Sequence, residues 1–107
     1  MPNEQLPESF QRLGQRHKAL LDAVDSLGQA AKQAGPVDEK TAQLIQLAAA
    51  AAIRSEGAVH SHVRRALQAG SNVEEIEHAI VLLTSTIGFP SVAAALSWVG
   101  DIVSPDS

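Results

Sequence analysis

Apolar side chains recur along the first third of the chain at spacings that alternate between four and three residues. The positions between them are mostly polar or charged, which is the pattern of an amphipathic helix with a coiled-coil seam. We predict one long helix over residues 6–33, ended by Gly35-Pro36. At 1.5 Å per residue it would be about 40 Å long, too long for a small domain to cover alone, so we expect a second copy of the chain to cover part of it. The seam consists of Leu6, Phe10, Leu13, His17, Leu20, Val24, Leu27 and Ala31.

Four further helices are predicted from the rest of the pattern. Asp38 caps a helix that runs to about residue 54 and contains an unbroken alanine run over 48–52. The next two helices cover about 58–69 and 73–87, and the last begins near Pro90. Residues 79–83 are apolar on every side of their helix, so we expect them to be buried. No segment alternates with the period of a strand, so the predicted fold is all-α, a five-helix bundle with a long first helix.

Length and composition narrow the protein class. With 107 residues we expect one domain over 1–107, its core over about 7–103. The absence of cysteine excludes a disulfide framework, a thiol nucleophile and a thiolate zinc site. A net charge of −4 argues against nucleic acid as a partner. The N-terminal residues lack the features of a signal peptide and no apolar run is long enough to span a bilayer, so we expect a cytoplasmic protein without a membrane partner.

Histidine is the best candidate for chemistry near neutral pH, and four are present: His17, His60, His62 and His78. His17, in the seam, is typical of a polar residue that sets helix register. His62 shares a helix face with apolar residues, which fits either a buried structural histidine or a functional one. His60 lies two residues away, about 200° around the helix, and is expected in solvent. The two rings cannot bind one metal ion from a regular helix and no motif supplies other ligands, so no metal or other cofactor is predicted.

The same segment contains the residues of two other candidate site types, a serine nucleophile and a DNA-binding motif. Ser55 lies two turns before His62, too far for a nucleophile and its base unless the helix breaks at Gly57. Arg64 and Arg65, near Arg54, form a basic cluster, and the spacing of Ala66, Gly70 and Ile76 resembles a helix-turn-helix. Three glutamates open the second helix of that motif and would repel phosphates. DNA binding is therefore the weaker alternative.

The order of these features resembles the carboxymuconolactone decarboxylase family, which includes the alkylhydroperoxidase D-like proteins. The resemblance runs from about Phe10 to about Leu96 and rests on four stretches in succession. It implies an all-helical fold that assembles as trimers or hexamers, with sites near subunit contacts. The stretches are Asp38-Glu39-Lys40-Thr41-Ala42-Gln43-Leu44-Ile45, His62-Val63-Arg64-Arg65-Ala66-Leu67-Gln68-Ala69-Gly70, Glu74-Glu75-Ile76 and Gly88-Phe89-Pro90.

The resemblance also identifies what this sequence lacks. In the peroxidase branch of the family a Cys-x-x-Cys pair precedes the histidine, and a glutamate one helix earlier serves a proton relay. Those cysteine positions fall on Ser55 and Ala58, and the glutamate position falls on Gln43. Only His62 matches. Disulfide-based peroxidase activity is therefore excluded for this chain, because neither Ser55 nor Ala58 can attack the peroxide bond or resolve a sulfenic acid.

Two functions stay open. A decarboxylase of this family needs neither cysteine nor cofactor, and His62 could be its proton donor. His78, Gln43 and Ser55 are further candidates, and Arg64 or Arg65 could neutralise the carboxylate of a small organic acid. The alternative is a non-catalytic helical scaffold or ligand-binding oligomer that kept the fold without the chemistry.

Overall fold

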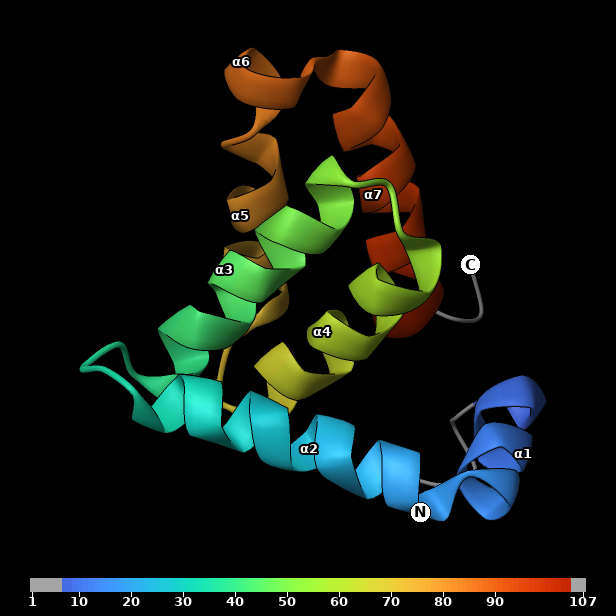
Figure 1. Ribbon diagram of the computed structural model, residues 1–107. Helices are drawn as coiled ribbons and strands as arrows, with labels where there is room; N and C mark the ends of the chain where they lie inside the picture. The colour runs from blue at the N-terminus through green and yellow to red at the C-terminus, as the bar shows by residue number, and fades with distance from the viewer. Residues whose placement is uncertain (1–6, 105–107) are drawn as a thin grey trace. The chain divides into compact units, whose positions relative to one another are not determined.

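The computed structural model describes residues 7–104, which form helices joined by turns, with no strand in that range (Figure 1). This agrees with the all-α prediction. None of these helices is both long and apolar enough to cross a membrane. The helices are α1 (Glu8–Arg16), α2 (Lys18–Gln33), α3 (Glu39–Ala52), α4 (Glu56–Gln68), α5 (Val73–Val81), α6 (Thr84–Ile87) and α7 (Phe89–Val103).

The contacts within the chain form two compact units, the first reaching Pro36 and the second beginning at Val37. In the first unit, the prediction of one long helix over 6–33 is wrong. His17 has φ −134° and ψ 51°, so it ends α1 and precedes α2. Gly14 weakens a continuous helix by about 1 kcal/mol relative to alanine. A Cβ at Gly14 would lie 3.5 Å from Leu21 Cδ1, an ordinary van der Waals contact, so the packing does not require glycine there.

The predicted seam is solvent-exposed within the first unit. Its large apolar members are 40–70 % exposed, and no residue of α1 or α2 is buried. Leu6, the first seam position, lies outside the described residues. The exposed members are Phe10, Leu13, Leu20, Val24 and Leu27.

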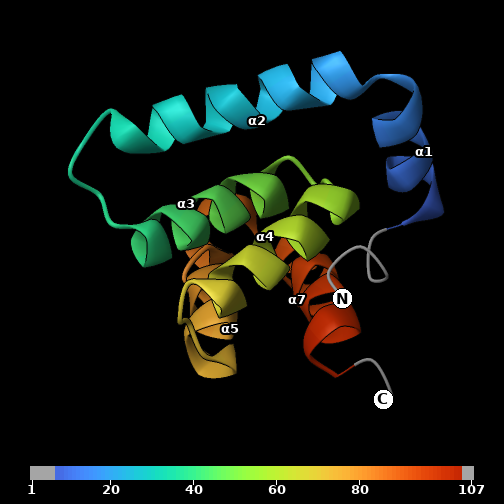
Figure 2. The same ribbon diagram turned by 90° about the horizontal axis from the view of Figure 1, so that it is seen from below.

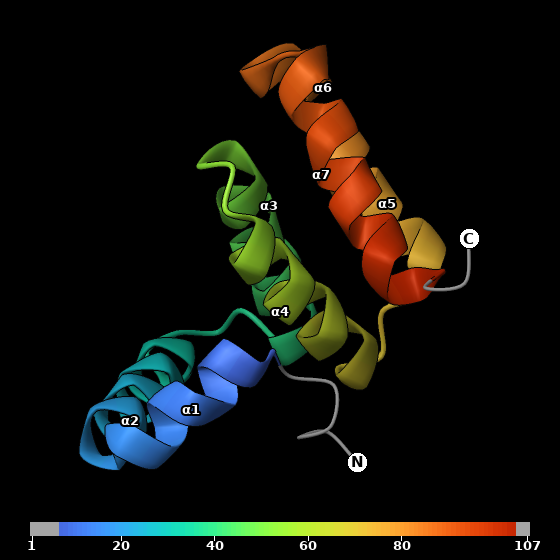
Figure 3. The same ribbon diagram turned by 90° about the vertical axis from the view of Figure 1, so that its right-hand side faces the viewer.

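The second unit is a bundle of two helical layers. Figure 3 shows α3 and α4 in one layer and α5 with α7 in the other, and Figure 2 shows the same layers from below. Helix α3 packs on α4 and α5, and α7 packs on the same two helices, so the core lies among the four. The core is built from small and branched aliphatic side chains, namely Leu47, Ala50, Ala51, Val59, Val63, Ala66, Ile76, Ile80, Val92, Ala95 and Val99.

Local hydrogen bonds explain where α3 and α5 begin. Asp38 caps α3 as predicted, because its Oδ1 accepts from the Thr41 N–H at 2.8 Å. Hydrogen bonds from Thr41 hold the pKa of Asp38 below its usual value. Asn72 and Glu75 form a capping box at the start of α5. The Lys40 ammonium, 2.8 Å from Glu75 Oε2, lowers the pKa of Glu75, and the Asn72 backbone N–H lowers it further.

The fourth predicted helix, over 73–87, is two helices. Helix α5 ends at Val81, where the Thr84 hydroxyl donates to the Val81 carbonyl at 2.7 Å, and the short α6 follows. Threonine and serine hydroxyls compete with the helical ladder in this way. With the break at His17, this makes the five-helix prediction wrong. The expected burial of 79–83 is also wrong in part, because Val81 is 47 % and Leu82 64 % exposed in the single chain.

Candidate functional site

His62 is joined to α3 by a chain of side-chain hydrogen bonds. From the middle of α4, its Nδ1 lies 2.9 Å from Gln43 Oε1. Gln43 is fully buried, and its Nε2 donates to Glu39 Oε2 at 2.8 Å. Glu39 and Gln43 are four residues apart and therefore share one face of α3. The result is a Glu39–Gln43–His62 relay that runs from an exposed carboxylate to a half-buried imidazole.

The relay assigns the proton on the His62 ring. A carboxylate only accepts hydrogen bonds, so the Gln43 group that faces Glu39 is its NH₂. The Gln43 oxygen therefore faces His62, and Nδ1 must carry the hydrogen that it accepts. In the neutral ring the lone pair then belongs to Nε2. The relay thus fixes both the orientation and the tautomer of the His62 ring.

Replacing Gln43 with alanine is expected to lower the free energy of unfolding by about 2–4 kcal/mol, because the change leaves the His62 Nδ1–H without its acceptor and opens a cavity. Urea denaturation measures the loss. Gln46→Ala on the same helix is the matched control, since the Gln46 Oε1 is buried without a hydrogen-bond partner among the described residues. Equal losses in the two variants would mean that the relay adds nothing to stability.

The turn between α3 and α4 contains the second unusual feature of this region. Arg54 has φ 56°, a left-handed conformation that favours glycine. Its N–H bonds to the Ala51 carbonyl, and the next N–H bonds to that of Ala50, the pattern of a Schellman motif. Helix α4 ends in the same pattern with Gly70 at the left-handed position. At Arg54 the residue in this conformation is not a glycine, and its guanidinium donates a hydrogen bond to Ser91 Oγ on α7 at 2.8 Å.

The other predicted site residues are not members of the Glu39–Gln43–His62 relay. Helix α4 is continuous past Gly57, so Ser55 at its N-cap stays two turns from His62. His78 lies on the exposed face of α5, two residues from the buried Ile76 and Ile80. Arg65 is exposed and Arg64 half-buried on α4. Gln43 is therefore the predicted residue that the structure brings into hydrogen-bond contact with His62.

His60 is not the solvated side chain that the sequence predicts. It is half-buried, and its Nε2 lies 2.9 Å from Asp101 Oδ2 on α7. His60 and His62 point to opposite sides of α4, as their spacing requires, one toward α7 and one toward α3. The partner of His60 is 41 residues away in the sequence, which is why the helical pattern could not indicate it.

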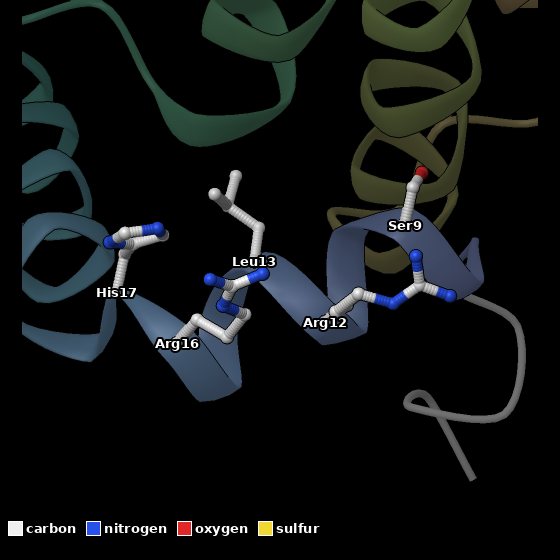
Figure 4. A pocket seen from close by; sticks show the side chains of 5 residues that line it. All are labelled: Ser9, Arg12, Leu13, Arg16 and His17. Carbon is white, nitrogen blue, oxygen red and sulfur yellow. The ribbon is translucent and has the colours of Figure 1, made fainter.

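The first unit has a hollow of its own, of about 180 Å³, at the junction of α1 and α2 (Figure 4). Two arginines, Arg12 and Arg16, make it cationic. All of its lining residues are exposed, so solvent screens these charges and the hollow is a weaker candidate than the relay. The lining residues are Ser9, Arg12, Leu13, Arg16 and His17.

The comparisons with known proteins agree with the resemblance drawn from the motifs. The model of the carboxymuconolactone decarboxylase family matches residues 18–101, most of the chain, including α3, α4 and the relay. The chain belongs to the carboxymuconolactone decarboxylase family. It is also 37 % identical over 59 residues to an uncharacterized protein of Haemophilus influenzae. That match covers 55 % of this chain and 52 % of the relative, so the chain spans about half the length of that relative.

Glu39 is the member of the relay that was not predicted as a site residue from the sequence. The signal was present, because Glu39 and Gln43 stand four apart on a helix that the sequence predicts. Arg54 had no such signal, since a left-handed arginine cannot be recognised from residue types. Ser55 and Ala58, the positions that the motif assigns to the cysteines, are half-buried at the start of α4.

Proposed function

We propose that this member of the carboxymuconolactone decarboxylase family binds a small unsaturated organic acid beside His62 and removes its carboxylate without a cofactor. The observation that carries the proposal is the Glu39–Gln43–His62 relay. The relay holds the ring in one orientation through a fully buried amide whose two ends are both hydrogen-bonded, which is the support that a proton donor of fixed geometry needs.

The proposed reaction uses His62 as a proton donor. In a carboxylated unsaturated lactone the bond between the ring carbon and the carboxylate breaks, and CO₂ leaves. The electron pair stays on carbon, conjugated with the lactone carbonyl, and a proton from Nε2 of the protonated ring forms the new C–H bond. The Glu39 carboxylate, at the other end of the relay, supports positive charge on the ring before the transfer. Arg65, three residues after His62 on the same helix, would hold the substrate carboxylate before it is lost, whereas Arg64 is four residues from His60 and shares the face of that histidine.

The test is an assay of CO₂ release by the purified protein on a panel of carboxylated unsaturated lactones. We expect turnover of at least one member without added metal or cofactor. No turnover with any of them, under conditions where the protein is folded by circular dichroism, would contradict the enzymatic proposal.

The alternative is a ligand-binding protein without catalysis, and one observation favours it. Gln43 replaces the glutamate that the resemblance assigns to the proton relay, and an amide cannot pass a proton as a carboxylate can. On this alternative an organic acid shifts the ring resonances of His62 in NMR spectra but is recovered unchanged. Shifts together with CO₂ release support the enzyme instead.

We also propose that the protein is a homo-oligomer, a trimer or a hexamer, as the family resemblance implies. Large apolar side chains on the second unit are exposed in the single chain, including Ile53 at 75 % and Phe89 at 65 %. Such side chains favour burial between subunits. Sedimentation at micromolar concentration should give a multiple of the 11.2 kDa chain mass. A monomer at that concentration would contradict the proposal.

A further inference from the structure

Three side chains with metal-ligating atoms meet where the start of α4 lies beside the end of α7. Glu56 and His60 stand four apart on α4 and therefore share a face, and Asp101 comes from the last turn of α7. One ligand atom from each of the three residues lies within 4.8 Å of the other two. The two helices pack against each other in the second unit (Figures 1 and 3).

The chemistry of this set distinguishes it from a group of surface acids. The His60 side chain, which is 21 % exposed, supplies an imidazole nitrogen. Its Nε2 lies 2.9 Å from Asp101 Oδ2. Imidazole with carboxylates suits zinc and its first-row neighbours, whereas Mg²⁺ and Ca²⁺ prefer oxygen ligands alone. One nitrogen and two carboxylate oxygens make a three-ligand site that water can complete.

We propose that Glu56, His60 and Asp101 bind a divalent transition-metal ion, with Zn²⁺ as the probe, and that the ion joins α4 to α7. Zinc ligands lie about 2.0–2.2 Å from the ion, so two of them can be at most about 4.4 Å apart. The His60 and Asp101 atoms already satisfy this limit. To complete the site, therefore, only the Glu56 side chain has to move closer to the ion. That side chain is exposed and does not pack in the core.

This site is separate from the proposed reaction. His60 faces α7 and His62 faces α3, so a metal ion at His60 lies on the other side of α4 from the relay. The sequence argued against a metal because His60 and His62 cannot share one. The two histidines still cannot bind one ion, but Asp101, which only the packing of α7 on α4 brings close to His60, can.

The experiment measures Zn²⁺ binding by calorimetry and by the thermal unfolding midpoint of the full chain. Saturating zinc should raise the midpoint of the parent protein by several degrees, because the ion binds only the folded arrangement of the two helices. His60→Gln and Asp101→Asn should each bind zinc at least about tenfold more weakly. His78→Gln, the same change at an exposed histidine of α5, should bind like the parent protein.

Three outcomes would overturn the proposal. These are no zinc-induced rise in the parent protein, an equal rise in His60→Gln, and unchanged affinity in Asp101→Asn. The last would reduce the site to two side chains of one helix. Should a variant fold poorly, NMR of the parent protein decides, because zinc should shift the ring resonances of His60 and leave those of His78 in place.

Discussion

Replacing His62 with glutamine is expected to lower kcat/KM for decarboxylation by about 10²- to 10⁴-fold, the usual range for loss of a general acid. Glutamine can still hydrogen-bond to Gln43 across α3 and α4, so the relay keeps a partner. It has no group that can donate a proton to carbon near neutral pH. The loss should therefore fall on kcat, with KM changed much less, if the side chain acts on the transition state.

His17→Gln provides the matched control for this prediction, because it makes the same substitution in the first unit of the chain. It should keep the activity of the parent protein. Initial rates of CO₂ release with each variant give the comparison, after circular dichroism has shown equal helix content. A His62→Gln protein as active as the parent would exclude His62 as the proton donor and would leave it a structural residue.

Replacing Leu47 with alanine is expected to lower the free energy of unfolding by about 2–5 kcal/mol, because Leu47 is fully buried at the centre of α3 and its loss leaves a cavity. Each 1 kcal/mol corresponds to about 4–8 °C in a domain of this size, so the midpoint should fall by about 8 °C or more. The buried core consists of alanines and branched aliphatic residues, and Trp98, the aromatic side chain that packs against it, is only partly buried.

Ile45→Ala is the control for the core substitution. Isoleucine and leucine are isomers, and Ile45 lies on the same helix but is 55 % exposed. Both variants are compared with the parent protein by urea and thermal denaturation at one protein concentration, since an oligomer makes the midpoint depend on concentration. An Ile45→Ala loss as large as that of Leu47→Ala would show that Ile45 is buried between subunits in solution.

Several features follow from the sequence because they depend on neighbouring residues. Asp38 is an N-cap before a run of good helix formers, and the structure has its side chain in that role. The alanine run of α3, Gly70 at the end of α4 and the all-helical content are of the same kind. The motif around His62 also identified the family without any coordinates.

The predictions of a single helix over 6–33 and of full burial of 79–83 were wrong, because residue spacing alone determines neither helix continuity nor burial. The seam of residues 6–33 has regular spacing, but that spacing does not show that the backbone of His17 leaves the helical conformation. The apolar segment at 79–83 predicts burial on every side, whereas one chain offers neighbours on one side only. Leu82 therefore remains exposed in the single chain.

The candidate site, too, could be predicted only in part from the sequence. The sequence by itself determined the helical class, the family and the absence of thiol chemistry, because these depend on residue types and spacing along one chain. Only the tertiary structure decided that His62 contacts Gln43 and that His60 contacts Asp101. The reason is physical, since a helix fixes which face each side chain occupies but not which other helix that face will meet.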